Sequence, residues 1–207
     1  MKSHNAVHFG LAVCIVLLSG CTSPGVNNDS ANGSITSFHP TVLPVPSMQP
    51  ASSSPGYITY ANPNYGIKMT YPSDLKKQEE ITGETIFFLS ARDSTTEAYP
   101  ANLDIMVLDL SSQPLTLDEF TNQSLEQISG MVPDYRLTDS RKAALSKEDA
   151  YLIAYTGTQG LLKLKWMSVY TIKNDTLYLL TYTAGADRFQ TYLPAVSRML
   201  DSFEITA

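Results

Sequence analysis

Two short turns in the C-terminal half constrain the fold of this chain most strongly. β-rich runs cover Tyr151–Tyr155, Leu162–Ile172 and Leu177–Thr183. The segments Gly157–Gly160 and Lys173–Asp175 separate these runs and have the composition of turns. Because connections this short cannot carry the chain back to the start of a parallel neighbour, successive strands must be antiparallel. The pattern therefore predicts an antiparallel meander.

Three earlier segments also predict strands. Tyr65–Tyr71 alternates with a period of two and is followed by a proline. Thr85–Ala91 and Leu103–Leu110 are apolar and β-rich. The polar segment Arg92–Pro100 lies between them and is expected to form a loop.

A helix is predicted over Thr116–Val132. Thr116 and Glu119 have the spacing of a capping box, in which each side chain accepts a hydrogen bond from a backbone amide at the helix start. Gly130 and Pro133 mark its end. One apolar stripe, expected to face the core, contains Leu117, Phe120, Leu125, Ile128 and Met131.

A second helix is predicted over Asp187–Phe203, where Pro194 must either kink the helix or begin it. Its apolar face contains Phe189, Tyr192, Leu193, Val196, Met199, Leu200 and Phe203. The order of strands, helix, meander and helix predicts an α+β fold, with a twisted antiparallel β-sheet flanked by helices.

The N-terminus has the parts of a secretory signal. Lys2 supplies a positive charge, Leu11–Leu18 supply an apolar segment, and Leu18-Ser19-Gly20-Cys21 resembles the lipobox, whose cysteine is lipidated after cleavage. We therefore predict a lipoprotein signal peptide over residues 1–20 and a lipid anchor on Cys21. The alternatives are an ordinary secretory signal with a chance cysteine and a transmembrane anchor, for which the apolar run falls short of about 20 residues.

Composition changes after Cys21. Residues 21–56 are rich in Ser, Pro, Asn, Thr and Gly, which predicts a flexible tether, and residues 57–207 have the length and composition of one domain. From Tyr57 onward, 13 Lys and Arg stand against 19 Asp and Glu, a net charge of −6. This balance disfavours nucleic acid and anionic lipid as partners, and it is compatible with weak cation binding.

The predicted domain lacks two residue types that carry much of enzyme chemistry. The histidines are His4, His8 and His39, and the cysteines are Cys14 and Cys21. Residues 57–207 therefore cannot form a Ser-His-Asp or Cys-His site, nor a zinc or copper site of imidazole or thiolate ligands. We expect no catalytic residue, no metal and no cofactor. Gly157–Gly160 lies between strands, which excludes a phosphate-binding loop at a helix start.

The remaining candidates for chemistry are carboxylates. Asp104 and Asp109 lie on one predicted strand at an odd spacing, hence on opposite faces. Asp118-Glu119 begins a helix, where capping explains the charge. Glu79-Glu80 and Glu148-Asp149 lie at turns and are expected to face solvent. A carboxylate-dependent hydrolase is thus an alternative without a supporting motif.

All 12 tyrosines lie from Tyr57 onward. The functional interpretation is an aromatic binding face, and the alternative, which we favour, is packing within the sheet. Trp166 is likewise expected to face the core. The tyrosines of the meander and last helix are Tyr151, Tyr155, Tyr170, Tyr178, Tyr182 and Tyr192.

Both ends of the domain carry short motifs. The first contains Tyr60, Asn62, Tyr65-Gly66-Ile67, Met69 and Tyr71-Pro72-Ser73-Asp74, and the second is Met199-Leu200-Asp201-Ser202-Phe203. The first resembles the opening of PsbP-like domains, with a Tyr/Asn segment, an aromatic-Gly-apolar strand and a Tyr-Pro-Ser turn. The second resembles the closing helix and Ser-Phe pair of that family. Leu75 departs from the tryptophan of many members but can fill the same apolar site.

The resemblance covers Tyr57–Ala207 and implies the PsbP-like α/β/α sandwich, with a binding or assembly role rather than catalysis. No ligand residue of the family maps onto this chain. Together with the lipobox, it predicts a non-catalytic module in the cell envelope, anchored to a membrane through Cys21, facing outside the cytoplasm and bound to an envelope protein rather than nucleic acid. The alternative from another class is a lipoprotein that binds a small molecule or ion between sheet and helices.

Overall fold

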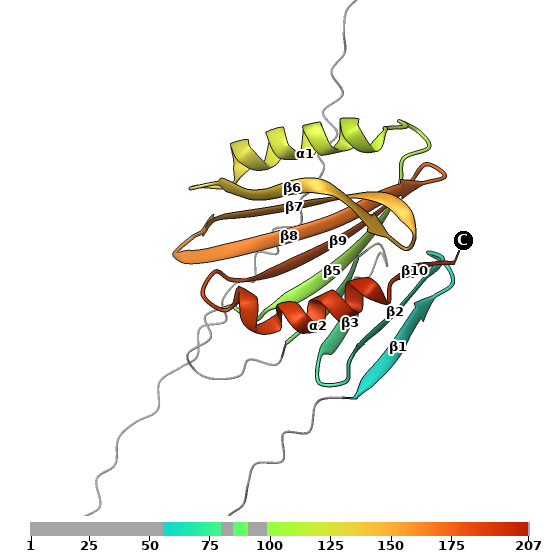
Figure 1. The fold of residues 1–207 in the computed structure, drawn as a ribbon, viewed down its shortest axis with the longest axis horizontal. Coiled ribbons are helices and arrows are strands. Elements are labelled where there is room, and N and C mark those ends of the chain that lie inside the picture. Colours follow the sequence, from blue (N-terminus) through green and yellow to red (C-terminus); the bar gives the residue numbers. More distant parts are fainter. Residues whose placement is uncertain (1–55, 80–84, 91–98, 207) are drawn as a thin grey trace, which may run out of the picture. The chain divides into compact units, whose positions relative to one another are not determined.

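The computed structural model describes residues 56–79, 85–90 and 99–206 (Figure 1). The predicted signal peptide, Cys21 and nearly all of the predicted tether lie outside the described residues, so these remain predictions.

Seven antiparallel strands form the main sheet, as the meander predicted. The central strands have apolar residues on both faces, as is typical of strands that are covered on both sides. Two-residue turns with positive φ at both positions, Ser146–Lys147 and Asn174–Asp175, join two of the hairpins and have the conformation that suits the twist of paired strands. In spatial order the strands are β3 (Lys76–Glu79), β4 (Thr85–Leu89), β5 (Asn102–Asp109), β9 (Thr176–Gly185), β8 (Leu162–Lys173), β7 (Glu148–Gln159) and β6 (Arg136–Leu145).

A second, three-stranded sheet contains β1 (Tyr57–Asn62), β2 (Ile67–Pro72) and β10 (Glu204–Ile205), with β2 in the centre. The sequence predicted β2 but not β1, β3 or β10. The sequence of β3 is Lys-Lys-Gln-Glu, which has no apolar alternation, and β10 has only two residues. Such strands form because they can pair with a neighbouring strand, and the local sequence pattern does not predict that pairing.

The helices cover opposite faces of the main sheet. On β8, Tyr170 contacts α1 (Leu117–Met131), whereas its neighbour Val169 belongs to the core that includes residues of α2 (Phe189–Asp201). Figure 1 shows α2 in front of the sheet and α1 along its β6 side. The predicted α+β class, a twisted antiparallel sheet flanked by helices, is confirmed.

The capping box of α1 is present as predicted, but the predicted apolar stripe is partly wrong. Glu119 N donates to Thr116 Oγ1 at 3.2 Å, and Thr116 N donates to Glu119 Oε2 at 2.9 Å. The side chain of Met131 is exposed, and Leu117 and Leu125 are only half-buried. The Tyr170 hydroxyl donates a hydrogen bond to Thr121 Oγ1, so a partly polar side of α1 faces the sheet. The buried residues of α1 are therefore Phe120, Thr121, Ser124 and Ile128.

The prediction of a turn over Gly157–Gly160 is wrong for Gly157, which lies within β7; the turn is Gly160–Leu161, with Gly160 at φ +60°. A Cβ at Gly157 would collide with Val132 Cγ1 and stand 2.9 Å from the carbonyl oxygen of Pro133. Gly157 is therefore a position of close approach between β7 and the segment after α1, rather than a turn residue.

Helix α2 begins at Phe189 and passes through Pro194, so the proline does not start the helix. Its apolar face agrees with the prediction, since Phe189, Val196 and Met199 are buried. Pro194 is exposed, so the backbone group that its ring leaves without a partner faces solvent.

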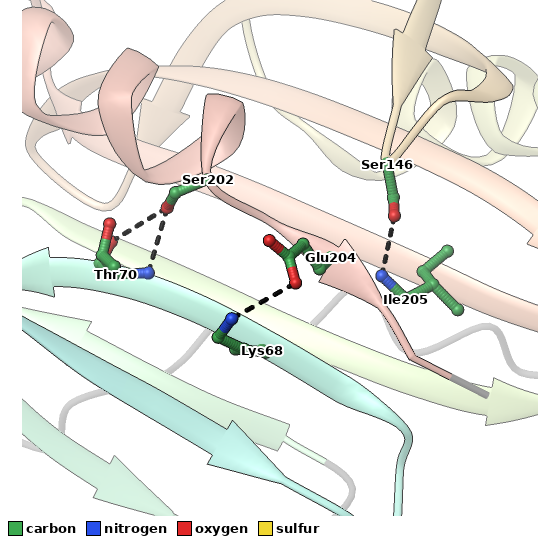
Figure 2. Close-up of polar contacts among 6 residues, drawn as sticks. All are labelled: Lys68, Thr70, Ser146, Ser202, Glu204 and Ile205. Atoms are coloured by element: carbon green, nitrogen blue, oxygen red, sulfur yellow. Dashed lines mark hydrogen bonds and ion pairs between the residues drawn. The ribbon is translucent and has the colours of Figure 1, made fainter.

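The two segments that carry the family resemblance lie together (Figure 2). Thr70 N of β2 donates to Ser202 Oγ at 3.0 Å, and Lys68 pairs with Glu204 at 3.4 Å. Ile205 N donates to Ser146 Oγ at 2.7 Å, which ties β10 to the β6–β7 turn. Ser202 of the closing Ser-Phe pair therefore fastens the segment after α2 to β2.

Candidate functional site

The candidate site is a groove between α2 and the main sheet, called the α2 groove. It has a volume of about 30 Å³. Leu75 borders it from the segment between β2 and β3, and the other walls come from α2, β4, β5 and β9, with Ser90 directly after β4 and Ala101 directly before β5. The lining residues are Leu75, Phe88, Ser90, Ala101, Asn102, Leu103, Tyr182, Tyr192, Ala195, Val196 and Met199.

Contacts at the N-terminal end of α2 hold this helix over the α2 groove. Tyr182 of β9 donates its hydroxyl to the carbonyl oxygen of Phe189 at 2.8 Å, and the two rings lie 4.4 Å apart. Lys165 Nζ stands 4.8 Å from the centre of the Phe189 ring, a cation–π contact. The wall that α2 offers is thus fixed by the sheet rather than by the helix alone.

Ser90 places one polar atom in this apolar groove. Its backbone N–H donates to the carbonyl oxygen of Ala101 at 2.8 Å, which fixes the residue at the end of β4. Its side-chain Oγ is buried and has no hydrogen-bond partner among the described residues. A buried hydroxyl without a partner costs roughly 1–3 kcal/mol, so a ligand group that bonds it would recover part of this free energy.

The size of the α2 groove decides what it can hold. About 30 Å³ is room for two or three water molecules, at about 10–15 Å³ each. Pockets that bind metabolites usually measure about 300–1,000 Å³. The α2 groove therefore suits the tip of one apolar side chain from a partner better than a whole small molecule.

A larger pocket lies at the start of α1, beside β6 and β7. Its volume is about 380 Å³, and Thr116, Leu117, Asp118, Lys142, Ala143, Asp149, Ala150 and Tyr151 line it. Asp118, Lys142 and Asp149 are exposed, so solvent screens the charges of both signs. We call it the α1 pocket; it offers volume without a desolvated polar group.

Asp104 and Asp109, the two carboxylates of β5, do not form a catalytic pair. Asp104 is buried and Asp109 is exposed, on opposite faces as predicted. A hydrogen bond from Ser111 N, at 2.8 Å, lowers the pKa of Asp109. Glu79 pairs with Lys77 at 2.6 Å, which lowers the pKa of Glu79 and raises that of Lys77.

Other predicted carboxylates have structural partners. Hydrogen bonds from Thr116 lower the pKa of Glu119, which is the expected effect of a capping role. Glu148 pairs with Lys173 at 3.3 Å, and Glu80 lies outside the described residues. Within residues 56–79, 85–90 and 99–206, no three His, Cys, Asp or Glu side chains are grouped so that they could hold a metal ion.

Most tyrosines of the meander pack within the sheet, as favoured from the sequence, whereas Tyr151 and Tyr192 are only half-buried. Tyr155, Tyr170, Tyr178 and Tyr182 are buried, and burial raises the pKa of Tyr170 to about 12. The indole of Trp166 is buried and stacks on Tyr155 with ring centres 5.1 Å apart. Because these rings are covered, they offer no aromatic binding face.

Sequence reasoning missed both pockets. The α2 groove joins Ser90 to Ala195, which are far apart along the chain, and no repeat or motif links the two segments. Only the pairing of β4 with β5 and the packing of α2 bring them together. The one local signal was the apolar face of α2. It predicts that α2 packs on the sheet, but it does not predict that a groove remains between them.

The chain belongs to the PsbP-like protein family, whose match covers residues 12–205. Similar solved structures include the cyanobacterial PsbP protein CyanoP of Synechocystis sp. PCC 6803, with a TM-score of 0.55 and 14% identity over 77% of this chain and 98% of that chain. A mutant of the protein Mog1 has a TM-score of 0.52 and 10% identity over 73% of this chain and 96% of that chain. These likenesses show the fold alone.

LpqN of Mycobacterium tuberculosis, described as involved in cell envelope biogenesis, has a TM-score of 0.49 and 13% identity over 68% of this chain and 83% of that chain. No curated protein matches the sequence. In the part of the chain that the structure describes, neither helix is both long and apolar enough to span a membrane.

Proposed function

We propose that this chain is a non-catalytic binding or assembly module, lipid-anchored through Cys21 and exposed outside the cytoplasm. The observation that carries the proposal is Leu18-Ser19-Gly20-Cys21, a lipobox-like sequence placed ahead of a PsbP-like domain. The absence of histidine and cysteine from residue 57 onward supports a role without thiolate or imidazole chemistry.

The α2 groove is the proposed contact for an envelope protein. Its walls are mainly apolar, and an entering side chain would gain about 25 cal/mol for each Å² of apolar surface removed from water. Ser90 Oγ would accept or donate one hydrogen bond inside it. Such an anchoring pocket is a common centre of a protein interface.

Crosslinking of the full-length chain in its native membrane tests this proposal. Ala195, half-buried on the groove wall, is changed to Glu, and Ser197→Glu on the exposed side of the same helix is the matched control. We expect a protein that crosslinks to the parent and to Ser197→Glu but not to Ala195→Glu. Cys21→Ala should release the chain from the membrane. A partner retained by Ala195→Glu, or turnover by the purified chain, would refute the assignment.

A second candidate is a lipoprotein that binds a small molecule or ion. The observation that favours it is the α1 pocket, whose volume of about 380 Å³ lies in the usual range for ligand pockets. A ligand that binds the folded state raises the unfolding temperature. Thermal unfolding with panels of ions and metabolites, repeated on Tyr151→Ala, checks this candidate: a stabilisation that Tyr151→Ala abolishes supports it, and none refutes it for the panel used.

A further inference from the structure

The edges of the two sheets are protected unequally. Within the described residues the edge strands are β1, β3, β6 and β10. Exposed edges invite pairing with other chains, and proteins prevent this with charges, bulges or very short strands. β10 has two residues, and three of the four residues of β3 are charged. β6 carries Arg136, Asp139, Arg141 and Lys142 and has a bulge between Leu137 and Asp139.

β1 has none of these protections. Its sequence, Tyr-Ile-Thr-Tyr-Ala-Asn, has no charge and no proline, and its register with β2 is continuous. The side chains of Tyr57 and Ile58 are 37% and 46% exposed, although large apolar side chains are mostly buried elsewhere in the domain. β1 is therefore the edge on which strand addition is least opposed.

The hydrogen bonds within this sheet define which backbone groups of β1 are available. Ser73 N donates to the carbonyl oxygen of Gly56, and on the other side of β2, Thr70 N donates to Ser202 Oγ. In an antiparallel pair the hydrogen-bonded positions alternate, so Ile58 and Tyr60 bond to β2. The N–H and C=O groups of Tyr57, Thr59 and Ala61 consequently point away from β2, toward the open edge.

We propose that β1 pairs with β1 of a second copy of this chain, antiparallel and about a two-fold axis at Thr59. This register uses all three available residues, with Thr59 opposite Thr59 and Tyr57 opposite Ala61. Ile58 then lies beside Tyr60 of the other copy, which covers its exposed surface, and none of the paired β1 residues carries a charge. The strand is thus complementary to itself, as a two-fold interface requires.

Because this contact is small, we expect it to form where the chains are concentrated. A six-residue strand buries less than the roughly 1,000 Å² expected of a stable interface, so the pair is weak in dilute solution. Two copies held on one membrane have a far higher effective concentration, which favours the pair. In this respect the inference rests on the proposed anchor at Cys21.

Disulfide trapping in host membranes tests the pairing directly. Residues 22–207 contain no cysteine, so Thr59→Cys adds a unique thiol on an exposed strand. Opposed residues at hydrogen-bonded positions have Cα atoms about 5.5 Å apart, within the range that a disulfide spans. Ser140→Cys on β6 is the matched control on a protected edge, and the parent chain shows any dimer made through Cys21 itself.

With a mild oxidant, we expect Thr59→Cys to give a disulfide dimer at least about tenfold above Ser140→Cys, because confinement on the membrane favours the paired state. Co-expressed Tyr57→Cys and Ala61→Cys chains should crosslink to each other more than to themselves. Equal yields at Thr59 and Ser140, or a disulfide from Thr59→Cys to a different protein, would overturn the proposal. Release of the parent chain from membranes would instead show that the anchor, and not the edge, is wrongly assigned.

Discussion

Gly157→Ala should destabilise the domain strongly, because the segment after α1 lies directly on β7. The added Cβ would collide with Val132 Cγ1 and approach the carbonyl oxygen of Pro133 to 2.9 Å. That carbonyl already accepts a hydrogen bond from Thr158 N at 2.9 Å, so the segment cannot retreat without breaking it. Overpacking costs about 1–3 kcal/mol and the lost hydrogen bond about 1 kcal/mol more. We expect a loss of about 3 kcal/mol in the free energy of unfolding.

Urea and thermal unfolding of the chain from residue 22 onward measure this effect. For a domain of this size, the loss corresponds to a fall of roughly 6–12 °C in Tm. Gly130→Ala is the matched control, since a Cβ added at this position of α1 would meet nothing within 4 Å. Alanine there should raise stability by about 0.5–1 kcal/mol, because glycine is a poor helix former. Equal stability of Gly157→Ala and the parent would refute the close packing of β7.

Three further changes probe other contacts. Ser202→Ala should cost about 1–2 kcal/mol in urea unfolding, because Thr70 N loses its acceptor; an unchanged midpoint would contradict the fastening of the chain end. Ser124→Ala should stabilise by about 1 kcal/mol, since it removes from a helix a buried hydroxyl that has no partner in the described part of the chain; a loss of stability would show that Oγ has a partner. Glu119→Gln should be less stable than the parent at neutral pH, and this difference should vanish as the pH falls through the lowered carboxyl pKa, since that stabilisation is lost on protonation; a pH-independent difference in Tm would refute it.

The sequence predicted those features that nearby residues determine. The capping box requires only Thr116 and Glu119, three residues apart, and the structure has both of its hydrogen bonds. The turn predicted over Lys173–Asp175 and the apolar face of α2 are equally local, and both are present, with Asn174 and Asp175 as the turn residues.

Features set by distant contacts were not predictable in this way. From the sequence Gly157 is typical of a turn, and only the structure shows that Val132 lies against it. Met131 fits the apolar stripe of α1 by its spacing, but the hydrogen bond between Tyr170 and Thr121 turns another side of the helix toward the sheet. The candidate site is of the same kind, because Ser90 gains significance only when α2 covers it. Tertiary packing decides between local alternatives at each of these positions.

We propose above all that Cys21 anchors this domain to a membrane outside the cytoplasm. Mass spectrometry of the N-terminal peptide from the membrane-bound protein tests it most directly. We expect a chain that begins at Cys21, with the mass of its lipid chains added to that residue, and a Cys21→Ala chain that is no longer processed to this species. A mature N-terminus elsewhere, or an unmodified cysteine in membrane-bound protein, would contradict the account.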